Sequence, residues 1–200
     1  MEFDLAGEHA RYSYRLLAGL VTPRPIAWVT TCDEEGRINA APFSFFNVFG
    51  TRPPILGFAP GDKQPGIPKD TARNIRRTGE FVVNLVDEEL AAAMNETSAE
   101  VEFGVNELEL AGLTATESTG ITPPRIAEAP VSLECREWST MEIGKNRLVI
   151  GLIDRIHTRD GILDPETLLV NPDNFAPIGR MEVPSGYCRT EDRFSMTRPD

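Results

Sequence analysis

A short segment, KDTARNIRR at residues 69–77, has residue types that bind anions. It follows a loop rich in Pro and Gly, and Lys69, Asp70 and Thr71 begin a predicted helix. Free backbone N–H groups at a helix start, beside a hydroxyl and a lysine, form an anion site. The structural alternative is strong, because Asp70 is a favoured N-cap residue and its carboxylate would oppose a phosphate. The segment alone leaves both interpretations open.

A second segment, NAAPFSFFNVFG at residues 39–50, does not alternate apolar and polar residues as a half-buried strand should. Ser44 and Asn47 flank the adjacent pair Phe45 and Phe46. One interpretation is that the four phenylalanines of this segment fill a core, which is the simpler role. The other is that the backbone presents polar groups and aromatic rings to a flat ligand.

The segment TPRPIAWVTT at residues 22–31 predicts a strand that begins after a rigid Pro-Arg-Pro sequence. Thr30 and Thr31 are either ordinary strand-forming residues or polar groups of a site. Trp28 is expected in the core or at an interface.

Motifs that would define other chemistry are absent from the sequence. There is no GxGxxG after a predicted strand, no P-loop, no HExxH and no GxSxG. Of the two histidines, His9 and His157, the second fits a partly buried structural position in a strand. Three cysteines without a CxxC pair predict reduced thiols, and neither a disulfide framework nor a zinc site. No metal site is therefore predicted, and a histidine-dependent hydrolase is disfavoured.

Composition and charge limit the class of protein. The chain has 200 residues, 40% of them hydrophobic and 26% charged, which are ordinary values for a globular protein. Its net charge of -11 disfavours binding to nucleic acid or to an anionic membrane surface. The sequence contains neither a secretory signal nor an apolar segment long enough to span a bilayer. We expect a cytoplasmic protein with one domain over residues 1–200.

The predicted elements must position these segments. Helices are predicted over residues 9–21, from about 70 to 78 with Gly79 as the left-handed terminator, and over 87–96. A hairpin is predicted whose first strand covers residues 26–32 and whose second strand ends at residue 46. Further strands are predicted over 54–60, 80–86, 131–143 and 147–158, with loops over 61–68 and from 159 onward. Strands outnumber helices and are joined by hairpins, which predicts a mainly β fold with an antiparallel sheet or barrel and peripheral helices.

Taken in order, these segments resemble a known family. TPRPIAWVTT, INAAPFSFFN, RPPILGF, KDTARNI, TGEFVVNLV and the late IGRMEVPSGYCR are similar to the flavin reductase-like proteins of the FMN-binding split-barrel fold. The resemblance extends from about residue 12 to 190. It implies an antiparallel Greek-key split β-barrel that binds FMN, with FAD as the alternative, at the interface of a homodimer.

The resemblance also implies which residues contact the cofactor. Ser44, Phe45, Phe46 and Asn47 would line the isoalloxazine, with Thr30 and Thr31 close to it and Trp28 as a further candidate. Lys69, Asp70, Thr71 and Asn74 would receive the ribityl phosphate. An isoalloxazine needs an apolar slot with a few donors and acceptors at one edge, and these residue types supply both.

The activity implied by the resemblance is flavin reduction with NADH or NADPH, in which hydride passes from nicotinamide to flavin. Some members pass electrons to a partner oxygenase or another acceptor. Many members carry a histidine in the late segment, and this chain has none there, so Arg180 and Tyr187 are the only catalytic candidates. The absence keeps two alternatives open: a flavoredoxin-like electron carrier reduced by a separate protein, and a split-barrel module that binds another ligand such as haem or a deazaflavin.

Overall fold

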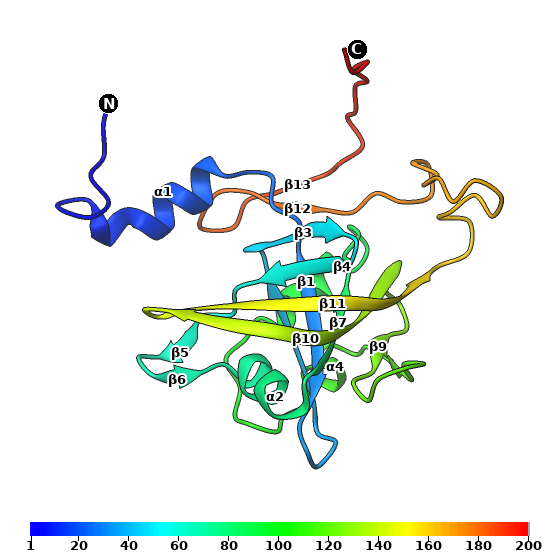
Figure 1. Ribbon diagram of the computed structural model, residues 1–200, viewed down its shortest axis with the longest axis horizontal. Coiled ribbons are helices and arrows are strands. Elements are labelled where there is room, and N and C mark those ends of the chain that lie inside the picture. Colours follow the sequence, from blue (N-terminus) through cyan, green and yellow to red (C-terminus); the bar gives the residue numbers. More distant parts are fainter. Residues whose placement is uncertain (200) are drawn as a thin grey trace.

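The computed structural model describes residues 1–199, and its centre is a seven-stranded antiparallel sheet (Figure 1). The strands of this sheet are β1 (Ala27–Cys32), β2 (Ile38–Phe43), β3 (Phe46–Thr51), β4 (Pro54–Phe58), β7 (Glu80–Asn84), β10 (Val131–Ile143) and β11 (Asn146–Thr158). Their order across the sheet is β2-β1-β7-β10-β11-β4-β3, and every neighbouring pair is antiparallel. The mainly β, antiparallel fold predicted from the sequence is confirmed.

The two ends of this strand order are joined by a connection of only two residues. β2 and β3 occupy opposite edges of the sheet, yet only Ser44 and Phe45 separate them in sequence. The sheet therefore curls until its first and last strands meet at this corner, as a barrel requires. The backbone N–H of Ala59, just after β4, donates to the carbonyl of Phe45 at 2.9 Å and secures the corner.

Alternate residues of the strands fill two separate cores. Ala27 and Val29 of β1 face an interior core that includes the tilted, contacting rings of Phe43, Phe58 and Phe81. The intervening Trp28 faces a second core on the outer side of the sheet. Both faces of β1 are thus covered, which explains why this strand reads as a continuous apolar run.

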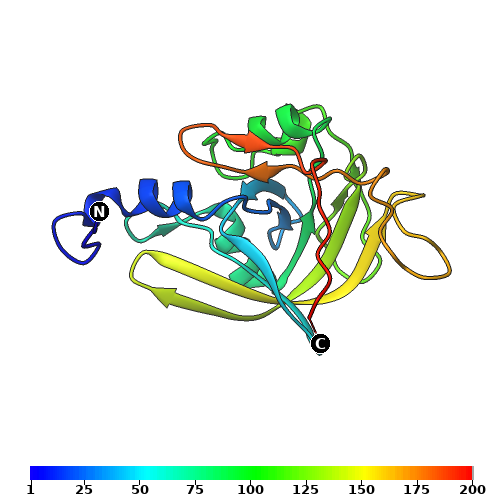
Figure 2. The same cartoon turned by 90° about the horizontal axis from the view of Figure 1, so that it is seen from above.

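The helices lie around the sheet. They are η1 (Ala10–Tyr12), α1 (Ser13–Leu20), α2 (Asp70–Thr78), α3 (Ala91–Glu96) and α4 (Glu107–Leu110). α2 packs onto the barrel by inserting Ile75 into the interior core. α1 lies at the periphery, away from the main sheet, in both Figure 1 and Figure 2. None of the helices in residues 1–199 is long and apolar enough to cross a membrane.

Three short hairpins complete the described chain. They pair β5 (Asp62–Gln64) with β6 (Ile67–Pro68), β8 (Ala115–Thr116) with β9 (Arg125–Ile126), and β12 (Gly179–Arg180) with β13 (Tyr187–Cys188). The predictions of plain loops over 61–68 and after 159 were therefore incomplete. Strands of two or three residues leave no hydrophobic periodicity for a sequence pattern to detect.

One predicted helix cap and one predicted helix start need correction. α2 begins at Asp70 as predicted, but its N-cap residue is Lys69, and Asp70 does not cap the helix with its side chain. α3 begins at Ala91 and not at residue 87. The carboxylate of Asp87 instead accepts the N–H of Leu90 at 3.3 Å, which forms a turn before the helix. Gly79 ends α2 in the left-handed region, with φ of 70°, as predicted.

Candidate functional site

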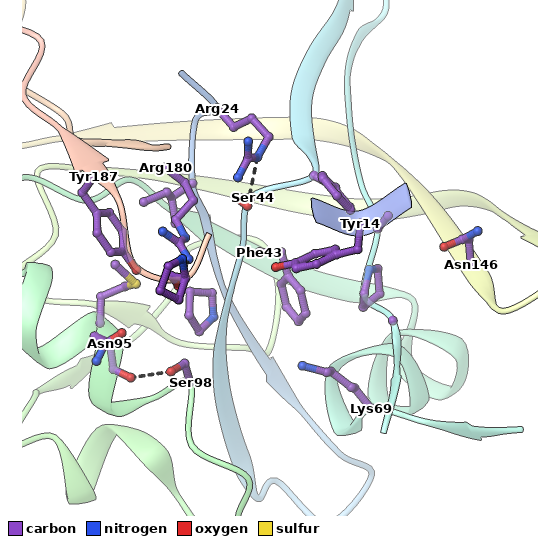
Figure 3. A pocket seen from close by; sticks show the side chains of 18 residues that line it. Tyr14, Arg24, Phe43, Ser44, Lys69, Asn95, Ser98, Asn146, Arg180 and Tyr187 are labelled. Carbon is purple, nitrogen blue, oxygen red and sulfur yellow. Dashed lines mark hydrogen bonds between the residues drawn. The ribbon is translucent and has the colours of Figure 1, made fainter. Parts of the chain in front are cut away.

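A cleft of about 550 Å³ opens at the corner between β2 and β3 (Figure 3). Its volume lies within the range of small-molecule and cofactor sites. Its walls come from helix α1, the segment just before β1, the β2–β3 corner, the loop after β4, the start of α2, the region of α3, the first residue of β11 and the β12–β13 hairpin. The polar and aromatic side chains used below are Tyr14, Arg24, Phe43, Ser44, Phe45, Lys69, Asn95, Ser98, Asn146, Arg180 and Tyr187.

The corner places an apolar wall beside free backbone donors. Phe43 ends β2 with its ring in the interior core, whereas Phe45 is 44% exposed and faces the cleft. Neither Ser44 nor Phe45 donates its backbone N–H to an acceptor among the described residues. Unpaired backbone groups of this kind need water or a ligand. The expectation of core packing for all four phenylalanines is thus wrong for Phe45 and for Phe49, which is 61% exposed.

Arg24 joins three walls of the cleft. Its guanidinium donates to the carbonyls of Ala18 at 2.5 Å, Val21 at 2.7 Å and Met181 at 2.9 Å, and to the hydroxyl of Ser44 at 3.3 Å. The side chain thereby connects the end of α1, the β2–β3 corner and the β12–β13 hairpin.

The environment of Arg24 is unusual for a cation. The residue is only 6% exposed, and burial, with the charge of Arg180 second, lowers the pKa of its guanidinium. Arg24 was not among the site residues predicted from the sequence. The only local feature that distinguishes it is its position between Pro23 and Pro25, which restrict the backbone on both sides.

The start of α2 contributes a lysine to the cleft. Lys69 lies with its Nζ atom 5.6 Å from the centre of the Phe43 ring. The carboxylate of Asp70 binds the Nζ atom of Lys63 at 2.7 Å and the Nη2 atom of Arg73 at 2.5 Å. Because Asp70 is neutralised in this way, it does not cancel the positive charge of Lys69 and of the helix start.

A narrow pocket of about 60 Å³ adjoins the cleft and shares the Lys69 wall with it. Asp70, Thr71 and the buried Glu107 line this pocket. Burial raises the pKa of Glu107, although its Oε2 atom accepts the N–H of Ala40 at 2.9 Å. That bond satisfies a backbone donor on the edge strand β2.

A buried polar network lies behind the start of α2. The amide of Asn39 donates to the hydroxyl oxygen of Thr71 at 3.0 Å, and the amide of Asn74 donates to that of Thr31 at 3.1 Å. The Oδ1 atom of Asn74 has no partner among the described residues, although Asn74 is buried. Thr71 acts as acceptor in its bond, so its own hydroxyl hydrogen is available to a ligand.

The structure brings together some of the residues predicted from the sequence and separates others. Ser44, Phe45, Lys69, Arg180 and Tyr187 line the cleft, and Asp70 and Thr71 line the adjoining pocket. The remaining candidates line neither space in this chain: Trp28, Thr30, Thr31, Phe46, Asn47 and Asn74.

Each of these remaining side chains has partners of its own. Trp28 donates its indole N–H to Thr97 at 2.9 Å, and Thr30 donates to the carbonyl of Pro124 at 2.5 Å. Phe46 packs against the interior core, and the side chain of Asn47 accepts the N–H of Val48 at 2.8 Å.

His157 lies outside the cleft. Its Nε2 atom is 2.6 Å from the Oε1 atom of Glu134, a fully buried carboxylate. Glu134 also accepts the backbone N–H groups of Thr119 and Gly120 at 2.7 and 2.8 Å. This cluster attaches the 117–124 loop to the sheet. Within residues 1–199 no cluster of His, Cys, Asp and Glu side chains is arranged to hold a metal ion.

Comparison with known proteins identifies the family of the chain. The family model described as "Flavin reductase like domain" matches residues 19–179. Among solved structures, a 2-nitrobenzoate 2-nitroreductase from Pseudomonas fluorescens is 38% identical, with a TM-score of 0.90 over 100% of this chain and 96% of that one. Component B of nitrilotriacetate monooxygenase from Bacillus cereus is 32% identical, with a TM-score of 0.92 over 98% of both chains.

A more distant structure agrees on the fold. A flavin reductase-type protein with a split barrel domain, from Shewanella frigidimarina, is 19% identical and has a TM-score of 0.82 over 100% of both chains. The fold of this chain is therefore the antiparallel split barrel expected from the resemblance.

Proposed function

The chain belongs to the flavin reductase-like domain family, and on that basis we propose that it binds FMN in the cleft and acts as an NAD(P)H-dependent flavin reductase. The observation that carries the proposal is the chemistry of the cleft walls. They combine aromatic and proline side chains with amide and hydroxyl groups and three cations, and the lining contains no carboxylate. A flat ring system with a polar edge and a phosphate fits such a lining.

The residues of the chain would hold FMN in one orientation. The free N–H groups of Ser44 and Phe45 suit the acceptors of the pyrimidine edge, with Phe43 and Phe45 providing apolar surface. Lys69 and Thr71 at the start of α2 would bind the phosphate. When bound, FMN supplies the capacity to accept hydride from nicotinamide, so the protein itself needs no acid or base at the site. The chain's contribution is to bind, orient and shield the ring.

We further propose a homodimer in which a second copy completes the flavin site. The cleft is open, and large aromatic side chains that line it are exposed, among them Tyr14 at 63% and Phe45 at 44%. Exposed apolar surface of this kind is typical of interfaces. Sedimentation of the FMN-loaded protein measures the assembly, and a monomer under those conditions would contradict this part of the proposal.

A flavoredoxin-like electron carrier is the second candidate, because no histidine lines the cleft among the described residues. The visible spectrum of the purified protein, followed by assays with NADH and NADPH with and without added flavin, separates the two functions. A reductase oxidises NADH or NADPH without any second protein. A carrier holds a yellow cofactor that is reduced only when a separate reductase is supplied. A colourless protein that binds no flavin contradicts both.

The phosphate assignment has its own test. Thr71→Ala should weaken FMN binding by about 1–3 kcal/mol, the usual effect of losing a hydrogen bond to a charged group. Riboflavin lacks the phosphate, so its affinity should not change. Thr78→Ala is the matched control, because its hydroxyl lies at the other end of α2 and donates to the carbonyl of Asn74 at 3.0 Å. Equal FMN affinity for the wild type and Thr71→Ala would remove Thr71 from the site.

A further inference from the structure

The cleft is positively charged in a strongly acidic protein. The chain has 31 acidic and 20 basic residues, yet the side chains lining the cleft include Arg24, Lys69 and Arg180 and no Asp or Glu. A cleft lined by one sign of charge concentrates the field inside it. Its ligands are therefore expected to be anions.

The two arginines of the cleft lack the carboxylate partners that several other arginines of the chain have. Arg136, Arg147 and Arg189 each pair with at least one Asp or Glu, whereas Arg24 and Arg180 form no ion pair among the described residues. Their hydrogen-bond acceptors are all neutral, being carbonyls and one hydroxyl. Arg24 is buried and Arg180 is partly buried, and buried cations are seldom left unpaired. An anionic ligand would supply the missing charge.

The geometry of Arg180 leaves donors free. Its Nη1 atom donates to the carbonyls of Gly186 and Glu182, and its Nη2 atom donates to that of Pro184. The Nε–H group and one Nη2 hydrogen have no acceptor among the described residues. The Nε–H and Nη2 groups share one edge of the guanidinium, the edge through which arginine binds a carboxylate or phosphate by two parallel bonds. The ring of Tyr187 lies 4.8 Å from the guanidinium carbon and restrains its plane.

The cations occupy two separate parts of the cleft. Figure 3 shows Arg180 and Tyr187 on one side of the strand that carries Phe43 and Ser44, and Lys69 on the other. FMN has one phosphate, which the proposed orientation places at Lys69. The Arg24 and Arg180 side then remains without an anion.

The walls beside the arginines are aromatic. Phe45 lies with its ring centre 5.8 Å from the guanidinium carbon of Arg24, and Tyr14 lies edge-on to Phe45 at 6.2 Å. With Tyr187, these rings suit a planar ligand.

We propose that the Arg24 and Arg180 side of the cleft binds the anionic group, a carboxylate or a phosphate, of a second, planar-ring substrate that meets the flavin. The inference rests on the proposed flavin site. It assigns Arg180 as the residue that selects anionic substrates, with Arg24 fixing the wall on which Arg180 sits.

Calorimetric titration of the FMN-loaded protein tests the proposal with two pairs of probes. Benzoate and its neutral analogue benzamide represent a carboxylate source, and nicotinamide mononucleotide and its dephosphorylated riboside represent a phosphate source. At least one anionic probe should bind about tenfold more tightly than its analogue without the anionic group, and the preferred pair identifies the source.

Variants assign the effect to Arg180. Arg180→Gln should lower the affinity for the anionic probe by about tenfold and leave the affinity for the matching analogue unchanged. Arg180→Lys should retain part of the affinity for the anionic probe. Arg125→Gln is the matched control, because Arg125 also donates only to a carbonyl, that of Glu117, and lies outside the cleft. Circular dichroism establishes that each variant is folded. Should Arg180→Gln not fold, the fall in wild-type affinity for the anionic probe with added chloride is the remaining test.

Three results would overturn the proposal. One is equal affinity for the anionic probe and its analogue in both pairs, and a second is the same response in Arg180→Gln and Arg125→Gln. The third is a loss of FMN affinity in Arg180→Gln as large as that of the anionic probe, which would place the flavin phosphate at Arg180. A protein that binds no FMN contradicts the proposed function instead, and the same titrations of the flavin-free chain then test the anion subsite separately.

Discussion

Replacing Arg24 with methionine should detach two walls of the cleft from the barrel. Methionine fills much of the same volume but cannot donate to the carbonyls of Ala18, Val21 and Met181. A hydrogen bond from a charged donor contributes about 1.5–3 kcal/mol, and a buried carbonyl left without a donor costs about 1–3 kcal/mol. The carbonyl of Ala18 is buried, while the other two lie where water can replace the guanidinium.

The expected loss follows from these terms. Removing a buried charge that has no carboxylate partner offsets part of the loss, so the free energy of unfolding should fall by about 2–3 kcal/mol. Urea unfolding followed by tryptophan fluorescence measures this. Tryptic cleavage at Arg11 and Arg15 should also become faster, because local opening of α1 would precede global unfolding.

Arg189→Met is the matched control for this measurement. Arg189 pairs with the carboxylate of Glu88, but both side chains are more than half exposed. Exposed ion pairs contribute about 0–1 kcal/mol, so this variant should be almost as stable as the wild type. If Arg24→Met and Arg189→Met have equal stability and equal cleavage rates, Arg24 does not hold the cleft together.

Three further predictions concern packing, pH and thiol reactivity. Gly151→Ala should destabilise the fold by about 1–3 kcal/mol in urea, because a Cβ atom there would lie 2.4 Å from the ring of the buried Phe81. Burial opposes ionisation of Glu134, but bonds from two backbone N–H groups and His157 prevail and hold its pKa below the usual value. Its contribution to stability should be complete above about pH 4.3 and lost as pH falls through the lower folded pKa, and Glu134→Gln should remove that part of the acid dependence. In native protein near pH 8, a chromogenic disulfide reagent should label Cys188, the one cysteine that is not buried.

Controls make these three tests decisive. Gly61→Ala places a Cβ atom where nothing lies within 4 Å, so its stability should equal that of the wild type, and a loss as large as that of Gly151→Ala would refute the steric explanation. An unchanged acid profile in Glu134→Gln would refute the linkage argument. Burial raises the pKa of Cys32 to about 11, so rapid labelling of more than one thiol before unfolding would contradict the described burial.

Elements defined by local patterns were predicted well from the sequence. The strand at Val131–Ile143 matches its predicted bounds, and its partner begins one residue earlier than predicted, at Asn146. The helix Asp70–Thr78 and its glycine terminator were also predicted. In these places the β-branched runs, the turn residues and the glycine all favour the same structure.

Features that depend on which groups pair with one another in the folded chain were not predicted. Asp70 has the residue type of an N-cap, but Lys63 and Arg73 bind its carboxylate, and that charge pairing decides its role. The importance of Arg24 depends on Met181, which is 157 residues away in sequence. A single sequence contains no signal for such a pairing, because the partner is a backbone carbonyl that any residue could provide.

The corner between β2 and β3 explains why barrel closure and ligand binding occur at the same place. A strand inside a sheet uses its N–H and C=O groups in the ladder, so it has none to offer a ligand. At Ser44 and Phe45 the chain leaves one edge of the sheet for the other, and neither N–H group finds a strand to pair with. The same turn rotates Phe45 out of the core while Phe43 stays inside it. The break in apolar and polar alternation over residues 39–50 therefore marks the point where the chain crosses from one edge of the sheet to the other. The free N–H donors and the aromatic surface of the cleft are direct consequences of that crossing.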